Sequence, residues 1–473
     1  MTTPEITSEI ETPVREDAAI QDLRTRLRGQ VIGRADDGYE AARKVYNAMI
    51  DRRPYLIARC VDAADVIALV NFARENGLTL AVRGGGHSVP GFGTCDDGLV
   101  IDLSRMKGIR VDPETHTAWA QGGCTWGDLD HATHAFGLAT PGGVVSTTGI
   151  AGLTLGGGVG HLSRKYGLSC DNLISADVVT ADGRFLTASA NENEDLFWSL
   201  RGGSGNFGVV TSFQYRLHPV STVYAGPILY PLERAGDAMR NYRDCVAQAP
   251  EDLNALFAFV VVPPEPPFPQ HLHNTNVCAV LCCYVGPMDK AEQVVRPLRE
   301  FGPPIFDLVG PMPYPVVQSL FDATVPPGLQ NYWKGDFVGE MSDQYIDVHV
   351  KYGPGVPNIH SGVHVFAVDG AVHRLGNNDT AFNYRDARFM HVIDGVYPDP
   401  ADTPKIKTWV QNYWSELHPH SAGGAYVNFL GDEGEERVAA SYRDNYERLA
   451  AIKAKYDPTN LFHVNQNIKP NGR

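Results

Sequence analysis

The chain has 473 residues, of which 43% are hydrophobic and 20% are charged, and its formal net charge is −15. This length predicts two domains, since single hydrophobic cores stop growing at about 250–300 residues. The acidic balance argues against a nucleic-acid or anionic-membrane surface, because either needs clustered Lys and Arg. No apolar run approaches the roughly 18 residues of a membrane helix, so a membrane partner is not expected.

The N-terminal residues 1–17 are acidic and polar, and they predict a disordered tail rather than a signal peptide. The eight cysteines form no CxxC pair, so we expect neither a disulfide framework nor a zinc site. Cys278, Cys282 and Cys283 lie in an apolar run, which favours small buried thiols. A cytoplasmic protein without a metal ion is therefore expected.

The first 140 residues predict helices and strands in alternation, with glycine loops between them. Helices are expected at 18–32, 62–77 and 126–136, because apolar residues recur on one face of each. Gly77 and Gly137 suit the ends of the last two helices. Short strand-like runs separate these helices.

The stretch LAVRGGGHSVPGFG, residues 80–93, joins an apolar strand-like run to a glycine loop. Three glycines after Arg83 leave the backbone N–H groups free to lie against a ligand. They lead into His87, and a neutral histidine is a nucleophile. The stretch predicts a cradle for a phosphate-bearing cofactor. The plainer alternative is a glycine turn beside a structural histidine.

Two further glycine regions follow, at 141–160 and 202–217. The first, PGGVVSTTGIAGLTLGGGVG, offers many backbone N–H groups and hydroxyls, while its interleaved Val, Ile and Leu argue against a solvated linker. Between the two regions, Asp182 and Gly183 suit the tip of a hairpin. Both regions therefore extend the predicted cofactor site.

Beyond His218 and Pro219 the sequence changes character. Residues 220–424 hold strand-like runs (LFAFVVV, CAVLCCYV, GVHVFAV, FMHVID) separated by helical stretches such as 287–301 and 404–417. This pattern predicts a second domain, a sheet with helices on one face. A long helix is expected at 435–456, and the polar segment after it suits a closing loop packed on a ligand.

Taken together, five segments resemble the FAD-linked oxidases of the vanillyl-alcohol-oxidase (PCMH) type, and within them the berberine-bridge-enzyme-like group. The likeness covers nearly the whole chain after about residue 40, and the motifs stand in the family's order. The segments are RGGGHS (83–88), GxxGxxxGGGxG (149–160), RKYGLxxDN (164–172), RGGxGNFGVVT (201–211) and KYDPTNLFHVNQNIKP (455–470).

The resemblance implies an α+β fold. A two-lobed FAD-binding domain is expected at 41–220, after a tail and first helix at 1–40. A substrate-binding domain at 221–424 would place an antiparallel sheet, covered by helices, over the flavin. The C-terminal berberine-bridge-like segment, 425–473, would return to the FAD domain.

The resemblance also implies the cofactor, FAD. In that family the loop histidine, here His87, bonds covalently to the flavin 8α carbon. Many relatives add a cysteine bond, but Val145 stands at that position, so a single link is expected, as in the hydroxynicotine-oxidase branch. Cys124 or Cys170 is the alternative second anchor. The expected cofactor residues are Arg83, Gly84, Gly85, Gly86, His87, Ser88, Gly143, Thr148, Gly149, Gly152, Gly158, Gly208, Val210, Asn465 and Asn467.

Such an oxidase moves a hydride from a C–OH or C–N centre of a small organic substrate to the flavin, while a base removes a proton. Dioxygen then reoxidises the flavin and yields hydrogen peroxide. The expected base is Tyr426, with Asn428 on the same strand face two residues on. A merely packed aromatic is the alternative reading of Tyr426. The substrate would be a secondary metabolite, alkaloid, phenol or sugar.

The strand FMHVID, 389–394, should face the substrate. If its alternation matches relatives, Met390 and Val392 point inward, His391 points away, and the pocket is apolar. A register shifted by one would make His391 a rival base.

Two other functions stay open at this stage. The same fold can act as a dehydrogenase with a quinone or protein acceptor, or as a flavin-retaining binding protein without turnover. A nicotinamide-dependent enzyme is not expected, because the cradle reads GGGHS rather than GxGxxG. The sequence does not indicate an oligomeric state.

Overall fold

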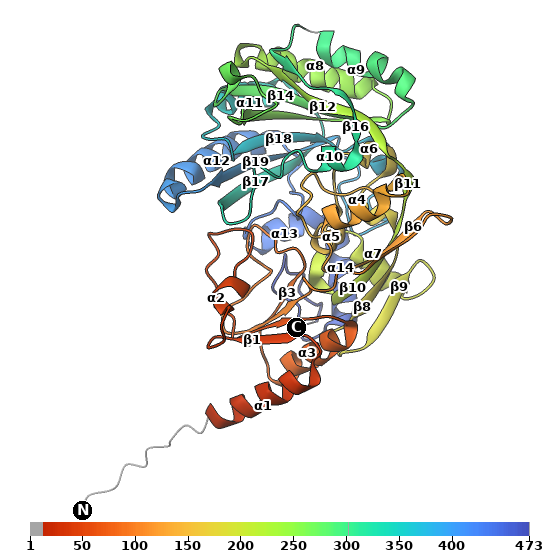
Figure 1. Cartoon of the computed structure of the whole chain (residues 1–473), viewed down its shortest axis with the longest axis vertical. Coiled ribbons are helices and arrows are strands. Elements are labelled where there is room, and N and C mark those ends of the chain that lie inside the picture. Colours follow the sequence, from red (N-terminus) through yellow and green to blue (C-terminus); the bar gives the residue numbers. More distant parts are fainter. Residues whose placement is uncertain (1–12, 301, 473) are drawn as a thin grey trace, which may run out of the picture.

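The computed structural model describes residues 13–300 and 302–472, in two stacked parts (Figure 1). The lower part holds two lobes and the C-terminus, and the upper part holds a large sheet covered by helices. Of the tail expected at 1–17, residues 1–12 lie outside the described residues. Residues 13–17 belong to helix α1, which begins at Pro13.

The first lobe is a four-stranded sheet in the order β1-β2-β4-β3, in which β2 and β3 run parallel to β4. Asp62 caps helix α3 by accepting a hydrogen bond from the Asp65 backbone, and the apolar stripe of α3 packs on the sheet. Strand β3 ends at Arg83, so it delivers the glycine cradle. The elements are α1 (Pro13–Arg26), β1 (Gln30–Gly33), α2 (Tyr39–Ala42), β2 (Leu56–Arg59), α3 (Ala63–Glu75), β3 (Leu80–Arg83) and β4 (Leu99–Asp102).

The second lobe is an antiparallel sheet of five strands in the order β5-β6-β10-β8-β9. Gly183, in the left-handed region with φ 79°, turns the hairpin between β8 and β9. The elements are β5 (Ile109–Asp112), β6 (Thr117–Gln121), α4 (Trp126–His134), β7 (Leu138–Ala139), α5 (Ile150–Leu155), α6 (Ser163–Tyr166), the 3-10 turn η1 (Ser169–Asn172), β8 (Leu173–Val179), β9 (Phe185–Ser189), α7 (Glu194–Leu200), β10 (Val209–Arg216) and β11 (His218–Pro219).

The upper part is one eight-stranded antiparallel sheet, and its four longest helices, α8, α9, α11 and α12, cover one face (Figure 1). Phe257, Val363 and Ile393 pack under these helices, whereas Phe366 and Val392 belong to a separate apolar cluster on the other face. The elements are β12 (Thr222–Tyr230), α8 (Ala235–Gln248), β13 (Leu253–Val261), β14 (Asn276–Tyr284), α9 (Ala291–Glu300), β15 (Phe306–Asp307), β16 (Gly310–Pro313), α10 (Tyr314–Gln318), β17 (Gln330–Val338), α11 (Asp343–Tyr352), β18 (Gly362–Ala367), β19 (Phe389–Tyr397) and α12 (Thr403–Leu417).

This architecture confirms the predicted α+β fold, with a two-lobed part and an antiparallel sheet covered by helices. The sheet is built wholly from residues 222–397. After α12 the chain returns to the lower part, where Leu449 and Ile452 join the core of the second lobe. Cys278, Cys282 and Cys283 are buried in strand β14 and are unpaired, as predicted.

Three local predictions were wrong. The first helix ends at Arg26, and strand β1 takes residues 30–33 because they pair with β2. The long C-terminal helix is two helices, α13 (Glu435–Tyr442) and α14 (Asn445–Tyr456), because Arg443 at φ 45° breaks the helical path. The segment 423–431 is a loop rather than a strand, and a turn closes it through the Phe429 N–H and the Tyr426 carbonyl.

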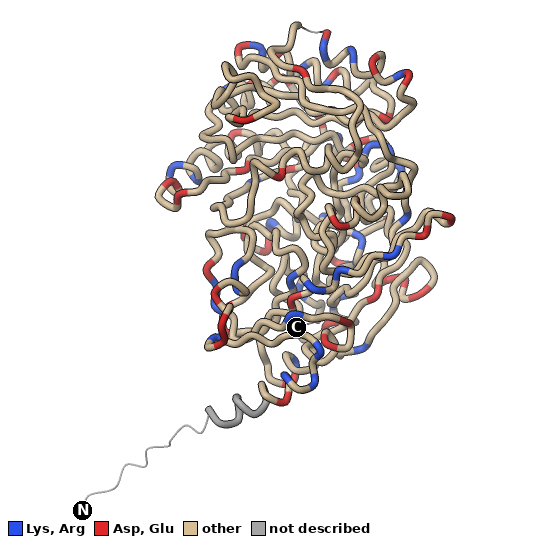
Figure 2. The backbone as a smooth tube through the Cα atoms, in the orientation of Figure 1, with Lys and Arg blue, Asp and Glu red and all other residues tan. Residues whose placement is uncertain are grey.

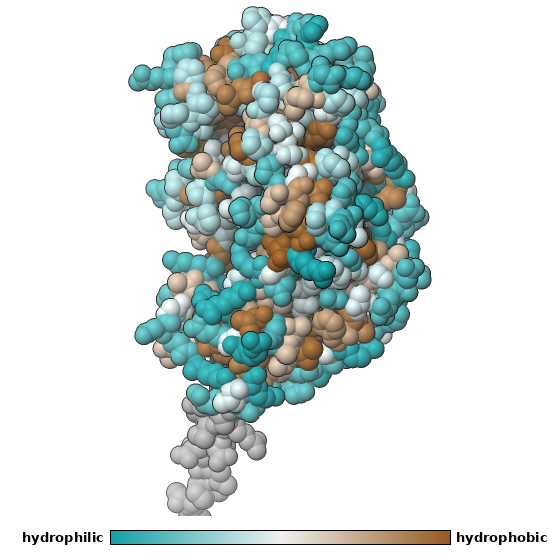
Figure 3. Space-filling view, turned by 45° about the vertical axis from the view of Figure 1, so that its right-hand side comes forward, coloured by the Kyte–Doolittle hydropathy of each residue, from teal (hydrophilic) through white to brown (hydrophobic). Residues whose placement is uncertain are grey.

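Along the backbone drawn in Figure 2, Lys and Arg positions are interspersed with Asp and Glu positions, and the net charge is −15. On the face shown in Figure 3 the surface is mostly hydrophilic, with hydrophobic groups gathered near its middle. Among the described residues, none of the helices is both long and apolar enough to cross a membrane.

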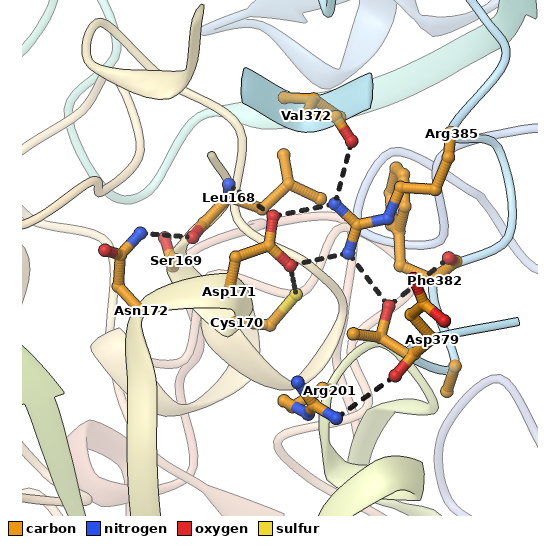
Figure 4. A network of polar contacts seen from close by, with 12 residues as sticks. Leu168, Ser169, Cys170, Asp171, Asn172, Arg201, Val372, Asp379, Phe382 and Arg385 are labelled. Carbon is orange, nitrogen blue, oxygen red and sulfur yellow. Dashed lines mark hydrogen bonds and ion pairs between the residues drawn. The ribbon is translucent and has the colours of Figure 1, made fainter. Parts of the chain in front are cut away.

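A buried ion pair joins the two parts (Figure 4). Arg385, in the loop before β19, donates two hydrogen bonds to Asp171 of η1, at 2.7 and 2.5 Å. The two side chains are only 2% and 8% exposed. Asp171 also accepts from the Leu168 N–H, and Arg385 also donates to the Thr380 hydroxyl. This bidentate pair holds the start of β19 against the second lobe.

Removal of one partner should leave the other charge buried and unpaired. We predict that Arg385→Ala lowers the free energy of unfolding by about 3–5 kcal/mol. Denaturant unfolding followed by circular dichroism measures this loss. The matched control is Arg374→Ala, which breaks the exposed pair with Glu251 and should change the free energy by less than about 1 kcal/mol. Equal losses in both variants would contradict the role given to the buried pair.

Candidate functional site

A cavity of about 340 Å³ lies between the two lobes and the uncovered face of the large sheet. It is lined by the cradle after β3, the loop 143–149, helix α5, the segment 204–210, the loop 426–430, the C-terminal segment 462–466 and the sheet. Its volume falls in the range of about 300–1,000 Å³ that is typical of ligand sites.

The cradle and the loop 143–149 touch each other through glycines. A Cβ atom on Gly85 would lie 2.4 Å from the Gly149 nitrogen, and a Cβ on Gly149 would lie 2.4 Å from the Gly85 nitrogen. No side chain fits at either position, so two stretches of bare backbone form one wall of the cavity.

Thirteen of the fifteen residues predicted to bind the cofactor line this cavity. The two that do not are Gly158 and Asn467. The Gly158 N–H instead donates to the Tyr426 hydroxyl at 2.8 Å. The thirteen residues are Arg83, Gly84, Gly85, Gly86, His87, Ser88, Gly143, Thr148, Gly149, Gly152, Gly208, Val210 and Asn465.

His87 is held on several sides. Its ring stacks on Tyr46, with centroids 4.0 Å apart. Its Nε2 lies 3.0 Å from the Thr147 hydroxyl, and its Nδ1 lies 3.3 Å from the Thr148 hydroxyl. Burial lowers the pKa of His87 to about 4. The imidazole is therefore neutral at neutral pH, the state in which it is nucleophilic.

On the side of the cavity away from the sheet, two polar atoms have no hydrogen-bond partner among the described residues. Arg83 is 7% exposed and donates to the carbonyls of Gly93 and Ala42, but its Nη2 is unpartnered. The Asn465 Oδ1 is likewise unpartnered. Buried polar atoms are normally satisfied, so these two await a polar ligand. Together with the bare glycine backbones, they fit a large polar cofactor such as FAD.

The alternative second anchors lie away from the cavity. Cys124 and Cys170 are buried, and neither lines it. Burial raises the pKa of both thiols, that of Cys124 to about 12, so neither is a thiolate at neutral pH. Val145 does line the cavity.

Tyr426 and Asn428 both reach the cavity, although from a loop rather than a strand. The Tyr426 hydroxyl accepts from the backbone N–H of Gly158 at 2.8 Å and of Val159 at 3.3 Å. The Asn428 amide donates to the same oxygen at 2.8 Å. Burial nevertheless raises the pKa of Tyr426 to about 12, so the hydroxyl keeps its proton. The three donated hydrogen bonds lower the pKa, but burial outweighs them, and a hydroxyl that stays protonated suits an anchoring role better than that of a base.

Strand β19 has the register in which His391 points away from the cavity. His391 packs among the covering helices, and its Nδ1 lies 3.1 Å from the hydroxyl of Tyr345 on α11. The sheet itself separates His391 from the cavity, so the role of rival base is wrong. Met390 and Val392 lie on the other face, and Val392 lines the cavity.

Two polar residues of the site were missed. His364 of β18 and Asp394 of β19 both line the cavity, and the His364 Nδ1 lies 2.9 Å from the Asp394 Oδ1. The pocket is therefore less apolar than predicted. The alternation that places Val392 inward also places Asp394 inward, so this residue could have been found from the sequence. His364 carried no comparable signal.

Aromatic side chains complete the sheet side of the cavity. The rings of Phe321 and His364 meet edge to face with their centroids 5.5 Å apart, and those of Trp333 and Phe429 do so at 5.9 Å. The ring of Phe366 packs on that of Phe429, with centroids 6.0 Å apart. This side of the site therefore offers an aromatic wall around one carboxylate–imidazole pair.

Comparison with known proteins agrees with this site. Residues 54–189 match the FAD binding domain family, and residues 425–469 match the berberine and berberine-like family. An FAD-linked oxidoreductase of Dictyostelium discoideum is 33% identical over 94% of this chain and 95% of its own length. The (R)-6-hydroxynicotine oxidase of Paenarthrobacter nicotinovorans is 31% identical over 94% of this chain and 98% of its own length.

A solved structure has the same fold. The crystal structure of 6-hydroxy-D-nicotine oxidase from Arthrobacter nicotinovorans superposes with a TM-score of 0.83, at 28% identity. The match covers 98% of this chain and 100% of that one. The chain therefore belongs to the berberine-bridge-enzyme-like family of FAD-linked oxidoreductases, with a PCMH-type FAD-binding fold.

Proposed function

We propose that the protein is an oxidase that removes a hydride from a C–OH or C–N centre of a small organic molecule. Bound FAD would supply the two-electron acceptor, and dioxygen would reoxidise it to give hydrogen peroxide. The single observation that carries the proposal is a neutral, clamped His87 on the wall of a cavity that fits the cofactor. Relatives named as nicotine oxidases support the reaction type.

His87 would hold FAD through one covalent bond to the flavin. Stacking on Tyr46 and the two threonine hydroxyls fix the ring, and its low pKa keeps a nitrogen lone pair available. The Arg83 guanidinium and the Asn465 amide would bind polar groups of the cofactor. Val145 offers no second attachment.

The reaction type is tested by mixing the protein with a panel of aromatic and aliphatic alcohols and amines, 6-hydroxynicotine and oligosaccharides among them. We expect one class to bleach the flavin without oxygen, and one peroxide to form per substrate in air. A flavin that bleaches but stays reduced in air for minutes would indicate a dehydrogenase. A flavin whose spectrum shifts without bleaching would indicate a binding protein.

The covalent link gives a second test. After acid denaturation and gel electrophoresis, flavin fluorescence should stay with the wild-type band and vanish in His87→Ala, because neither alternative anchor, Cys124 or Cys170, lines the cavity. The matched controls are Cys124→Ser and Cys170→Ser, which should both keep the fluorescence. Fluorescence that persists in His87→Ala would place the link on another residue.

The lowered pKa of His87 predicts how attachment depends on pH. At pH 5.5 an imidazole with the ordinary pKa of about 6.5 is only about one-tenth neutral. With a pKa of about 4, His87 is almost wholly neutral there. We therefore expect the attachment rate of added FAD to flavin-free protein, followed by gel fluorescence, to change less than about twofold between pH 7.5 and 5.5. A tenfold fall over this range would show that His87 has an ordinary pKa.

A further inference from the structure

We propose that His364, oriented by Asp394, is the proton acceptor of the reaction, and that the substrate is an aromatic alcohol or amine. This inference rests on the proposed function and assigns a residue and a substrate class to its site. The sequence pointed to Tyr426 for the proton transfer.

The pair is built into the sheet. In the ladder between β18 and β19, His364 faces Val392 and Gly362 faces Asp394, so the imidazole reaches diagonally to the carboxylate. The Nδ1–Oδ1 distance is 2.9 Å, and the side chains are 15% and 9% exposed. Neighbouring strands of a sheet hold this geometry more rigidly than loops would.

The contact with Asp394 decides which nitrogen of His364 is free. An ionised carboxylate only accepts hydrogen bonds, so Nδ1 must donate and Nε2 carries the lone pair. Within the described part of the chain, no hydrogen bond to Nε2 is found. A Cβ atom on Gly362 would lie 2.8 Å from the imidazole Cε1 and 3.4 Å from Nε2, so the glycine keeps that edge open. A base with one free nitrogen and a carboxylate behind it is suited to accept a proton.

The pair lines the same cavity as the attachment histidine. Burial raises the pKa of Tyr46, and the negative charges of Asp394 and Asp322 add to this shift. Tyr46 in turn stacks on His87. Asp322 is engaged elsewhere, since it accepts from the backbone N–H and the hydroxyl of Ser146. The Asp394 carboxylate, by contrast, lies against His364.

The walls indicate the substrate class. Phe321, Phe366, Phe429 and Trp333 present apolar rings, and the Trp333 Nε1 has no partner in the described chain. Among the described residues that line the cavity, Arg83 is the one Lys or Arg, and it stands at the end of strand β3, where the cradle begins. A flat aromatic compound fits these walls, and a neutral or cationic group fits beside Asp394. A carboxylate there would be repelled.

The proton step follows from this arrangement. The O–H or N–H bond at the reacting carbon breaks, its electron pair stays on oxygen or nitrogen, and the proton moves to Nε2 of His364. The Asp394 carboxylate then stabilises the imidazolium. Asp394 is thus a positioning residue and His364 a catalytic one.

The first test needs no turnover. In the FAD-loaded protein with ¹⁵N-labelled histidine, NMR should show His364, assigned with His364→Gln, as the tautomer with protonated Nδ1 and bare Nε2. Asp394→Ala should lose this preference. A protonated Nε2 in the wild type would overturn the proposal.

The second test probes the substrate class. Added 1-phenylethanol or 1-phenylethylamine should shift the Nε2 resonance and the flavin absorbance, whereas benzoate should do neither. The assignment of an aromatic alcohol or amine would be overturned if only benzoate bound, or if none of the three probes bound. If no compound of the substrate panel bleaches the flavin, the proposed function fails. The tautomer of His364 and the binding of the two aromatic probes can still be measured in that case, so this inference is tested separately.

The third test is kinetic and uses the substrate that the panel identifies. Anaerobic flavin reduction should slow by about 10²–10⁴-fold in His364→Ala and recover in part with added imidazole. The matched control, His360→Ala, removes a histidine bonded to the Thr324 carbonyl outside the cavity, and it should change the rate by less than threefold. A loss in Tyr426→Phe that exceeds the loss in His364→Ala would return the role of base to Tyr426.

Discussion

The site depends on a steric constraint, the contact between two backbones that leave no room for a Cβ atom. Because Gly85 and Gly149 touch, the loop 143–149 lies directly against the cradle. That contact brings Thr147 and Thr148 to His87. Any residue larger than glycine at either position would separate the loops by more than a hydrogen bond can span, and would release the histidine.

The same loop also contacts the segment that follows helix α10 in the upper part. Ser146 is bonded to Asp322 through its backbone N–H and its hydroxyl, at 2.9 and 2.5 Å. With the Asp171–Arg385 pair, this contact joins the lower lobes to the upper part at two points. The face of the sheet that carries His364 is thereby held opposite the cradle, as a reaction between a cofactor and a substrate requires.

The sequence predicted the lower part better than the upper part, for a physical reason. Glycine loops that cradle a cofactor leave a local signature in the sequence, because close backbone contacts such as that of Gly85 with Gly149 require glycine. Thirteen of the fifteen predicted residues line the cavity. The upper site arises from cross-strand neighbours. His364 and Asp394 stand thirty positions apart and meet only through the register of β18 and β19. The turn at Tyr426 and the break at Arg443 likewise follow from tertiary contacts.

Burial assigns opposite protonation states to the two residues that the sequence singled out. Desolvation disfavours the charged form of any group, so it keeps His87 neutral and Tyr426 protonated. A neutral histidine suits a nucleophile, whereas a protonated tyrosine is a poor base. His364 differs from both, because its carboxylate partner stabilises the charge that a proton would bring. A proton acceptor in a cavity lined mainly by apolar side chains needs such a partner, and the described cavity wall provides it at His364.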